Sequence, residues 1–246
     1  MGVTAGCLAL CLCAPCWAVD LMVSAASSLT NAFQEIGKAY EKEHPGTRVL
    51  FNFGASGQLL QQIARGAPAD VFASADEETM NRAQKQNLIA RESRVDFAVN
   101  KLLLITPDDS KLQISKLQDL TQAQVQRIAL GNPETVPVGR YTKAALEKAG
   151  LWNVLEPKYI YTQNVRQSLD YVFRGEVEAG FVYLTDASVS PVSVHTAFEV
   201  ATDQPIVYPI AAVKGYGNEN RALDFIAFVR SDAGRKVLDK YGFRRP

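Results

Sequence analysis

Two stretches of the chain follow the same plan, in which a short apolar run leads through a loop of small residues into an amphipathic helix. The first has an apolar run at 21–23, a loop ending at Ser28 and a helical pattern from Leu29 onward. The second has a β-rich run at 48–53, the loop Gly54-Ala55-Ser56-Gly57 and another helical pattern. Because such units recur along the chain, we predict an α/β protein with a mainly parallel sheet.

The end of the first loop has the chemistry of an anion site. The first N–H groups of a helix have no partner within the helix, and the helix dipole places partial positive charge there. Ser28 adds a hydroxyl beside those amides, a combination suited to an anion. An ordinary helix cap also explains a serine at this position. The first loop alone therefore leaves both interpretations open.

The pattern changes near the middle of the chain. Two β-rich runs, 95–99 and 102–105, follow each other almost without a break, and 198–201 with 206–213 form a matching return. We interpret these runs as two strands crossing between two α/β lobes. The predicted division is a first lobe of residues 19–98 plus 206–246, a second lobe of residues 99–205, and a ligand cleft between them.

The second lobe repeats the plan of strand, loop and helix. Residues 132–140 form a loop that leads into a predicted helix at 141–149, and Val165 lies at the start of another predicted helix. A polar connection at 116–126 is also predicted to be helical. The last two predicted helices, 219–229 and 232–241, have apolar faces that we expect to pack against the first lobe.

The first 18 residues resemble a secretory signal. An apolar run at 8–12 precedes Cys16-Trp17-Ala18, which fits cleavage after Ala18, although the segment contains no Lys or Arg. All four cysteines lie in this segment. We therefore expect an exported mature chain that has no disulfide, no thiol catalyst and no Cys-ligated metal, and that depends on its hydrophobic core for stability.

The charge balance argues against a large polyanionic partner. Lys plus Arg and Asp plus Glu each number 26, so no global field attracts nucleic acid or an anionic membrane. If this protein binds an anion, local dipoles must hold it.

Enzymatic interpretations have little support in the motifs. A nucleophile elbow would need Gly where Gln58 stands. Of the two histidines, His44 lies in a turn typical of an exposed loop, and His195 has no local acidic partner. Metal-site and phosphate-loop motifs are absent from the sequence, and Asp70 and Asp76 are interpreted as caps or turn formers. A secreted hydrolase stays the enzymatic alternative. An extracytoplasmic sensory lobe is a third, but it would need a membrane span that the predicted mature chain lacks.

Several loops in separate parts of the chain favour a ligand-binding protein. Ligands of open α/β sheets bind outside the carboxyl ends of the strands. Five residues lie at such positions and would offer hydroxyls, backbone N–H groups or a phenol: Ser28, Ser56, Val138, Val165 and Tyr183. Arg140 and Arg166 lie close by, either to hold the ion or to support the rim, and we favour the rim.

This set of donors has a consequence for the ligand. A fully deprotonated tetrahedral dianion accepts from every donor, whereas monohydrogen phosphate carries an O–H that needs an acceptor. An unpaired buried group costs about 1–3 kcal/mol. The donors therefore favour sulfate, molybdate and tungstate over phosphate, and ion size must separate sulfate from the other two.

Six motifs in chain order resemble the periplasmic molybdate-binding proteins of bacterial ABC importers; they lie at residues 24–30, 66–72, 131–139, 164–166, 180–183 and 241–243. The resemblance implies a two-lobed type II periplasmic-binding-protein fold. It also implies capture of molybdate or tungstate in the periplasm by a monomer that uses no cofactor. Delivery to a membrane permease with a separate ATPase would follow.

The family's oxyanion contacts, carried over position by position, fall on the same five residues: Ser28, Ser56, Val138, Val165 and Tyr183. Molybdenum would be bound only as molybdate, through these residues. Sulfate or another small tetrahedral oxyanion is the alternative ligand.

Overall fold

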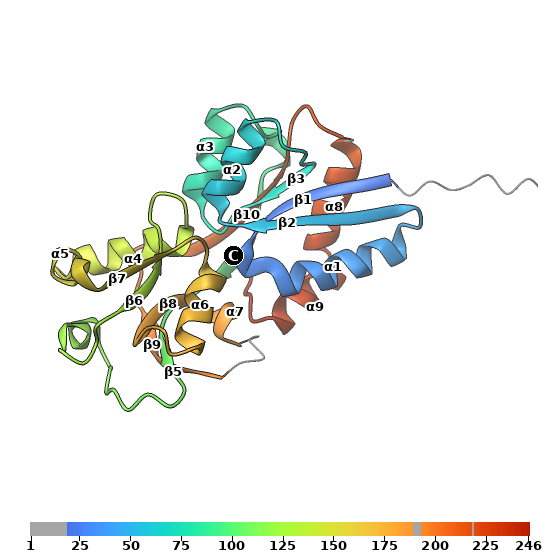
Figure 1. Cartoon of the computed structure of the whole chain (residues 1–246). Helices are drawn as coiled ribbons and strands as arrows, with labels where there is room; N and C mark the ends of the chain where they lie inside the picture. Colours follow the sequence, from blue (N-terminus) through green and yellow to red (C-terminus); the bar gives the residue numbers. More distant parts are fainter. Residues whose placement is uncertain (1–18, 189–192, 218) are drawn as a thin grey trace, which may run out of the picture.

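Two five-stranded sheets organise the chain into two lobes (Figure 1). The computed structural model describes residues 19–188, 193–217 and 219–246. The predicted signal segment, residues 1–18, lies outside the described residues. The predicted two-lobed α/β class is confirmed, and in each lobe helices flank the sheet (Figure 1).

The first sheet has the strand order β2-β1-β3-β10-β4. Its strands are β1 (Val19–Ala26), β2 (Thr47–Gly54), β3 (Val71–Ala73), β4 (Val95–Asn100) and β10 (Ile206–Ala212). Strand β1 pairs in parallel with β2 and β3, whereas β10 runs antiparallel to β3 and β4. The sheet is therefore mixed, because one of the two strands that cross between the lobes, β10, runs antiparallel to its neighbours.

Helices cover both faces of the first sheet. One face packs against α1 (Thr30–Glu43), α8 (Glu219–Arg230) and α9 (Asp232–Lys240), and the other against α2 (Ser56–Ala64) and α3 (Glu77–Lys85). On the first face the ring of Phe33 lies 5.7 Å from that of Phe97 and 6.2 Å from that of Phe225. Leu59, Phe72 and Met80 belong to a separate buried cluster on the other face.

The second sheet has the order β7-β6-β8-β5-β9. Its strands are β5 (Leu102–Pro107), β6 (Ile128–Gly131), β7 (Tyr159–Thr162), β8 (Ala179–Tyr183) and β9 (Val194–Val200). The helices α4 (Pro137–Lys148) and α6 (Val165–Phe173) follow β6 and β7, and the short helices α5 (Trp152–Leu155) and α7 (Leu184–Ser188) complete this lobe. This sheet is mixed as well, since β6 is parallel to β7 and β8 while β5 is antiparallel to β8 and β9.

The two crossings lie side by side. Strand β4 ends at Asn100 and β5 begins at Leu102, while β9 ends at Val200 and β10 begins at Ile206. Ile206 pairs with Asn100 on the first-lobe side, and Leu102 pairs with Val200 on the second-lobe side. The passage between the lobes is therefore a pair of adjacent strands.

Two local predictions need correction, and one short helix was missed. The polar segment 116–126 is not a helix; it contains one short 3-10 helix, Leu117–Thr121, held by Asp119, which accepts from Ser115 and Lys116. Helix α4 begins at Pro137, four residues earlier than predicted, because proline suits the first helical position. Helix α7 was not predicted, and its five residues are too few to show a helical period. Within the described residues, no helix is both long and apolar enough to cross a membrane.

Candidate functional site

A small cavity between the lobes brings together all five residues predicted to bind a ligand. Each lies at or just after the carboxyl end of a strand: Ser28 after β1, Ser56 after β2, Val138 after β6, Val165 after β7 and Tyr183 at the end of β8. The space left for the centre of a water-sized sphere is about 10 Å³. A cavity of this volume holds about one water molecule, which excludes a sugar or a peptide.

Helices α2 and α4, which begin at this cavity, leave their first N–H groups free of side-chain caps. The residues at the N-caps of α2 and α4 are Ala55 and Val136, neither of which makes a side-chain cap bond. Val138 is the second residue of α4, and Pro137 before it has no N–H. At α6 the Asn164 side chain accepts from a later residue, Gln167 N, at 3.1 Å. Backbone donors are therefore available to a ligand in both lobes.

Ser56 is held so that its hydroxyl proton remains available. Ala75 N donates to Ser56 Oγ at 3.0 Å, and a backbone N–H can only donate. The serine is fully buried, and its own proton is free to point into the cavity. Ser56 can therefore act as a donor to an anion.

Ser28 does not cap the helix that follows it. The 3-10 turn Ser27–Leu29 and helix α1 have no side-chain cap bond. Ser28 Oγ instead lies 3.0 Å from Tyr208 Oη on β10. The structure therefore does not support the alternative explanation of Ser28 as an ordinary cap.

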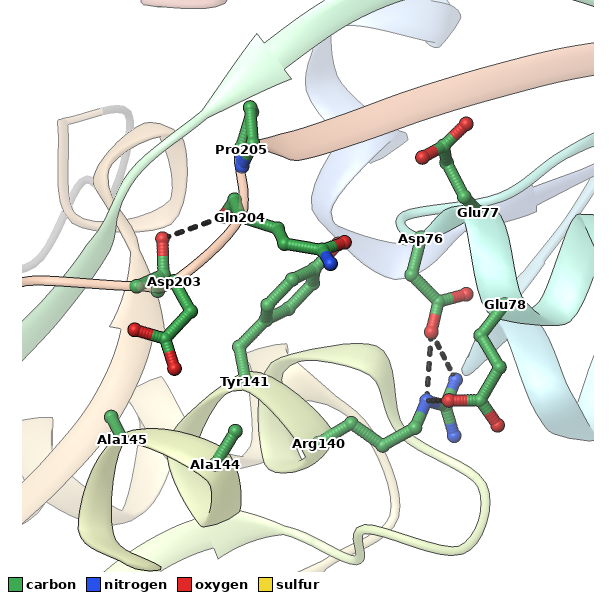
Figure 2. Close-up of a pocket in the computed structure, with 11 residues that line it drawn as sticks. Asp76, Glu77, Glu78, Arg140, Tyr141, Ala144, Ala145, Asp203, Gln204 and Pro205 are labelled. Atoms are coloured by element: carbon green, nitrogen blue, oxygen red, sulfur yellow. Dashed lines mark hydrogen bonds and ion pairs between the residues drawn. The ribbon is translucent and has the colours of Figure 1, made fainter. Parts of the chain in front are cut away.

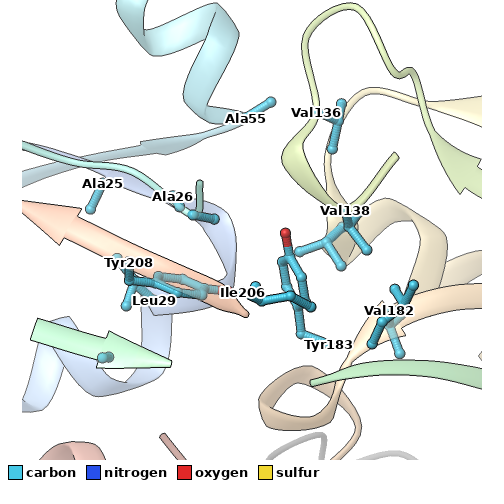
Figure 3. Close-up of a cluster of buried hydrophobic side chains, with 14 of the residues drawn as sticks. Ala25, Ala26, Leu29, Ala55, Val136, Val138, Val182, Tyr183, Ile206 and Tyr208 are labelled. Carbon is cyan, nitrogen blue, oxygen red and sulfur yellow. The ribbon is translucent and has the colours of Figure 1, made fainter. Parts of the chain in front are cut away.

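Tyr183 carries a buried hydroxyl without a hydrogen-bond partner in the described part of the chain. Its side chain is 1% exposed. Figure 3 shows the hydroxyl pointing into the space between Ala26 and Ala55 of the first lobe and Val136 and Val138 of the second. Burial raises the pKa of Tyr183 well above its usual value, so the phenol keeps its proton and can donate. An unpaired buried hydroxyl costs about 1–3 kcal/mol, which an acceptor in the cavity would remove.

Sequence reasoning missed the other residues that line the cavity, of which only Ser27 has a side-chain hydroxyl. Apart from Val136 and Pro137 they are small, so they leave room at the carboxyl ends of the strands. They are Ala26, Ser27, Gly54, Ala55, Ala75, Val136 and Pro137. Runs of small residues after predicted strands are the signal that could have found most of them.

Arg140 supports the rim by contacts with the other lobe (Figure 2). Its Nε donates to Asp76 Oδ2 at 2.7 Å and its Nη2 donates to Thr79 Oγ1 at 2.8 Å. Asp76 is itself the N-cap of α3 and accepts from Thr79 N. The guanidinium is therefore paired with a carboxylate and joins α4 of the second lobe to α3 of the first.

Arg166 is paired in a similar way. Its Nε lies 2.6 Å from Asp186 Oδ1 in α7, and its Nη2 donates to the backbone oxygen of Ser28 at 3.5 Å. Burial raises the pKa of Asp186 to about 6, against the opposing effect of the Arg166 charge. Because each arginine faces a carboxylate, the surroundings of the cavity are close to neutral.

A second, larger groove lies between α3, α4 and the connection from β9 to β10 (Figure 2). It offers about 280 Å³ and is lined by the carboxylates of Asp76, Glu77, Glu78 and Asp203 together with Arg140. This excess of carboxylates repels an anion, so the smaller cavity is the candidate oxyanion site. Among the residues that the structure describes, no group of three or more His, Cys, Asp or Glu side chains could hold a metal cation.

The comparisons with known proteins agree with this architecture. Residues 21–244 match the family model described as bacterial extracellular solute-binding protein. The molybdate-binding protein ModA of Haemophilus influenzae is 36% identical over 225 residues, which cover 90% of this chain and 88% of that protein. ModA of Escherichia coli is 35% identical over 91% of this chain and 88% of its own length.

A solved structure shows the same fold. The periplasmic molybdate-binding protein of Azotobacter vinelandii superposes with a TM-score of 0.80 at 24% identity, covering 92% of this chain and 99% of that one. The family match agrees with the prediction of a binding protein and not an enzyme. The chain belongs to the bacterial extracellular solute-binding proteins.

Proposed function

We propose that this protein captures molybdate, and tungstate in the same way, in the periplasm. It would deliver the ion as a monomer to the permease of an ABC importer that a separate ATPase drives. Two relatives named as molybdate-binding proteins, each aligned with about nine-tenths of this chain, support this proposal. The predicted export segment supports the periplasmic location.

The observation that carries the proposal is a cavity whose polar groups are arranged to donate. Ser56 Oγ is already occupied by the Ala75 N–H, and Tyr183 has a buried hydroxyl without a partner in the described part of the chain. The helix starts at Val138 and Val165 add backbone N–H groups. In this proposal each of these groups, with Ser28, donates to one oxygen of a tetrahedral oxyanion.

Among the described residues, the two arginines beside the cavity are both ion-paired, which fits the same ligand class. Arg140 and Arg166 are already paired with Asp76 and Asp186. A dianion would be held by neutral dipoles, as helix N-termini hold phosphate and sulfate in other proteins. Sulfate accepts hydrogen bonds from the same donors, so the fit between ion size and cavity size must provide any preference for molybdate.

A thermal-shift panel tests the proposal. Molybdate, tungstate, sulfate and phosphate are added to the full-length mature protein, and the melting temperature is recorded against concentration. A ligand at a thousandfold its Kd adds about 4 kcal/mol of stability. We expect a large shift with molybdate and tungstate. An equal shift with sulfate would contradict the specificity, and no shift with any oxyanion would contradict the function.

A further inference from the structure

The strands that cross between the lobes carry a hydrogen-bonded chain that ends at the cavity. Asn100 is the last residue of β4, and Tyr208 lies on the neighbouring strand β10. Asn100 Nδ2 lies 3.2 Å from Tyr208 Oη, which lies 3.0 Å from Ser28 Oγ. The chain therefore joins the crossing to a residue that lines the cavity.

The direction of this chain is set at its first link. Lys101 N donates to Asn100 Oδ1 at 2.9 Å, and a backbone N–H can only donate. The amide oxygen of Asn100 must therefore face Lys101, which turns the NH₂ group toward the hydroxyls of Thr185, at 2.8 Å, and Tyr208. Since an amide NH₂ has no acceptor, Tyr208 Oη must accept from Asn100.

The second link follows from the single proton of Tyr208. Tyr208 is fully buried, and the hydrogen bonds of its hydroxyl within the described residues go to Asn100 and Ser28. Burial raises the pKa of this phenol well above its usual value, so the proton is retained. With Asn100 donating to Tyr208, the Tyr208 proton is paired only if it points to Ser28 Oγ. The opposite orientation leaves a buried O–H unpaired.

We propose that Asn100 and Tyr208 are positioning residues that make Ser28 a hydrogen-bond donor toward the ligand. Tyr208 donates to Ser28 Oγ, so the Ser28 proton is directed into the cavity. Ser28 then meets the ligand with its proton, so a protonated oxyanion such as monohydrogen phosphate would place its own O–H against a donor. This inference rests on the proposed function, and it assigns the selectivity against protonated oxyanions to residues outside the cavity.

Two substitutions alter the chain in different ways. Tyr208→Phe removes the donor to Ser28 and leaves the serine hydroxyl free to accept. Asn100→Asp replaces the NH₂ group by an acceptor oxygen, which turns Tyr208 toward residue 100 and makes Ser28 donate to Tyr208. Tyr159→Phe is the matched control, because it removes one hydrogen bond, from Tyr159 Oη to Trp152 O at 2.8 Å, in a part of the second lobe that does not line the cavity.

The readout is the Kd of the full-length mature protein and each variant for molybdate, sulfate and inorganic phosphate, measured by calorimetry at one pH. We expect the phosphate-to-molybdate ratio of Kd values to fall about tenfold in Tyr208→Phe and in Asn100→Asp. The molybdate-to-sulfate ratio stays constant, since neither ion carries a proton. Tyr159→Phe leaves both ratios unchanged.

The outcomes separate this inference from the function on which it rests. If the wild type binds molybdate and the variants keep the wild-type phosphate-to-molybdate ratio, the proposed role of Asn100 and Tyr208 is wrong and the proposed function stands. An equal change in the molybdate-to-sulfate ratio would overturn that role too, because that result indicates an altered cavity shape. Wild-type protein that binds no oxyanion would overturn both. If Tyr208→Phe does not fold, Asn100→Asp decides the question.

Discussion

Gly57 in α2 of the first lobe donates its N–H to the backbone oxygen of Thr135 in the second lobe, at 3.0 Å. A Cβ at Gly57 would lie 2.6 Å from that oxygen. The lobes therefore meet, backbone against backbone, beside Ser56. Any separation of the lobes at this point would break this hydrogen bond.

Gly57→Ala should weaken ligand binding without destabilising the unliganded protein. The added methyl group pushes Thr135 away, and overpacking of this kind costs about 1–3 kcal/mol, or at least fivefold in Kd. The melting temperature without ligand should not fall, because alanine also favours the helix. Calorimetric titration with molybdate and a thermal melt measure the two effects.

Gly37→Ala is the matched control for that prediction. Its Cβ would lie 2.7 Å from Phe51 Cε2 within the first lobe. This variant should lose stability and keep the wild-type Kd. Unchanged affinity in Gly57→Ala would show that the contact with Thr135 does not limit closure.

The two serines of the site should respond alike to replacement by alanine. Ser28→Ala removes a donor to the ligand and leaves the buried Tyr208 proton, which points to Ser28 Oγ, without an acceptor. Ser56→Ala removes a donor and leaves the buried Ala75 N–H unpaired. Each unpaired group costs about 1–3 kcal/mol of unfolding free energy, measured by denaturant titration. Both variants should bind molybdate about tenfold more weakly.

Ser93→Ala tests whether such a loss of stability alone weakens binding. Ser93 Oγ accepts from Ala212 N at 2.8 Å, as Ser56 accepts from Ala75, but it does not line the cavity. Its replacement should lower stability and leave the Kd unchanged. A weaker Kd in Ser93→Ala would contradict the assignment of Ser56 as a ligand donor.

Tyr183→Phe should separate binding from stability. The unliganded protein loses a buried hydroxyl that has no partner within the described residues, so its unfolding free energy should stay constant or rise, by up to about 1–3 kcal/mol. Molybdate binding should weaken about tenfold because a donor is lost. A variant that is less stable and binds as wild type would show that the hydroxyl serves the fold and not the ligand.

Asp186→Asn should change the pH dependence of stability. Burial raises the folded-state pKa of Asp186 to about 6 from 3.8. The folded protein therefore holds this proton more tightly than the unfolded chain does. The resulting stability is fully present below the unfolded pKa and is lost as pH rises through about 6. As the pH rises from below 3.8 to above about 6, the unfolding free energy of the wild type should fall by up to about 3 kcal/mol relative to that of Asp186→Asn.

Asp119→Asn provides a control of opposite sign. The N–H of Ser115 lowers the pKa of Asp119 on the protein surface. The stability of the wild type relative to this variant should therefore increase with pH. Denaturant unfolding at a series of pH values measures both differences, and a pH-independent difference for Asp186→Asn would contradict the raised pKa.

The sequence predicted which residues line the site better than it predicted the hydrogen-bond and ion-pair partners of the residues around it. Ser28, Ser56, Val138, Val165 and Tyr183 were found because strand ends and helix starts are local patterns, and parallel strands bring their carboxyl ends to one edge. The partners of those residues depend on long-range packing. Tyr208 lies 180 residues from Ser28, and Asp76 lies 64 residues from Arg140.

The errors in secondary structure have two causes. Helix α4 begins at Pro137 because proline suits the first helical position, a local signal that the loop prediction overlooked. The mixed pairing of each sheet depends on how the crossing strands return, which leaves no local period in the sequence.

The central claim is that one oxyanion is held between the lobes by donors from both. An anomalous difference map, recorded at the molybdenum edge from crystals of the protein grown with molybdate, tests it most directly. We predict one molybdenum peak in the cavity, with oxygens within about 2.5–3.0 Å of Ser28 Oγ, Ser56 Oγ and Tyr183 Oη. A peak elsewhere, or no peak at saturating molybdate, would contradict the claim.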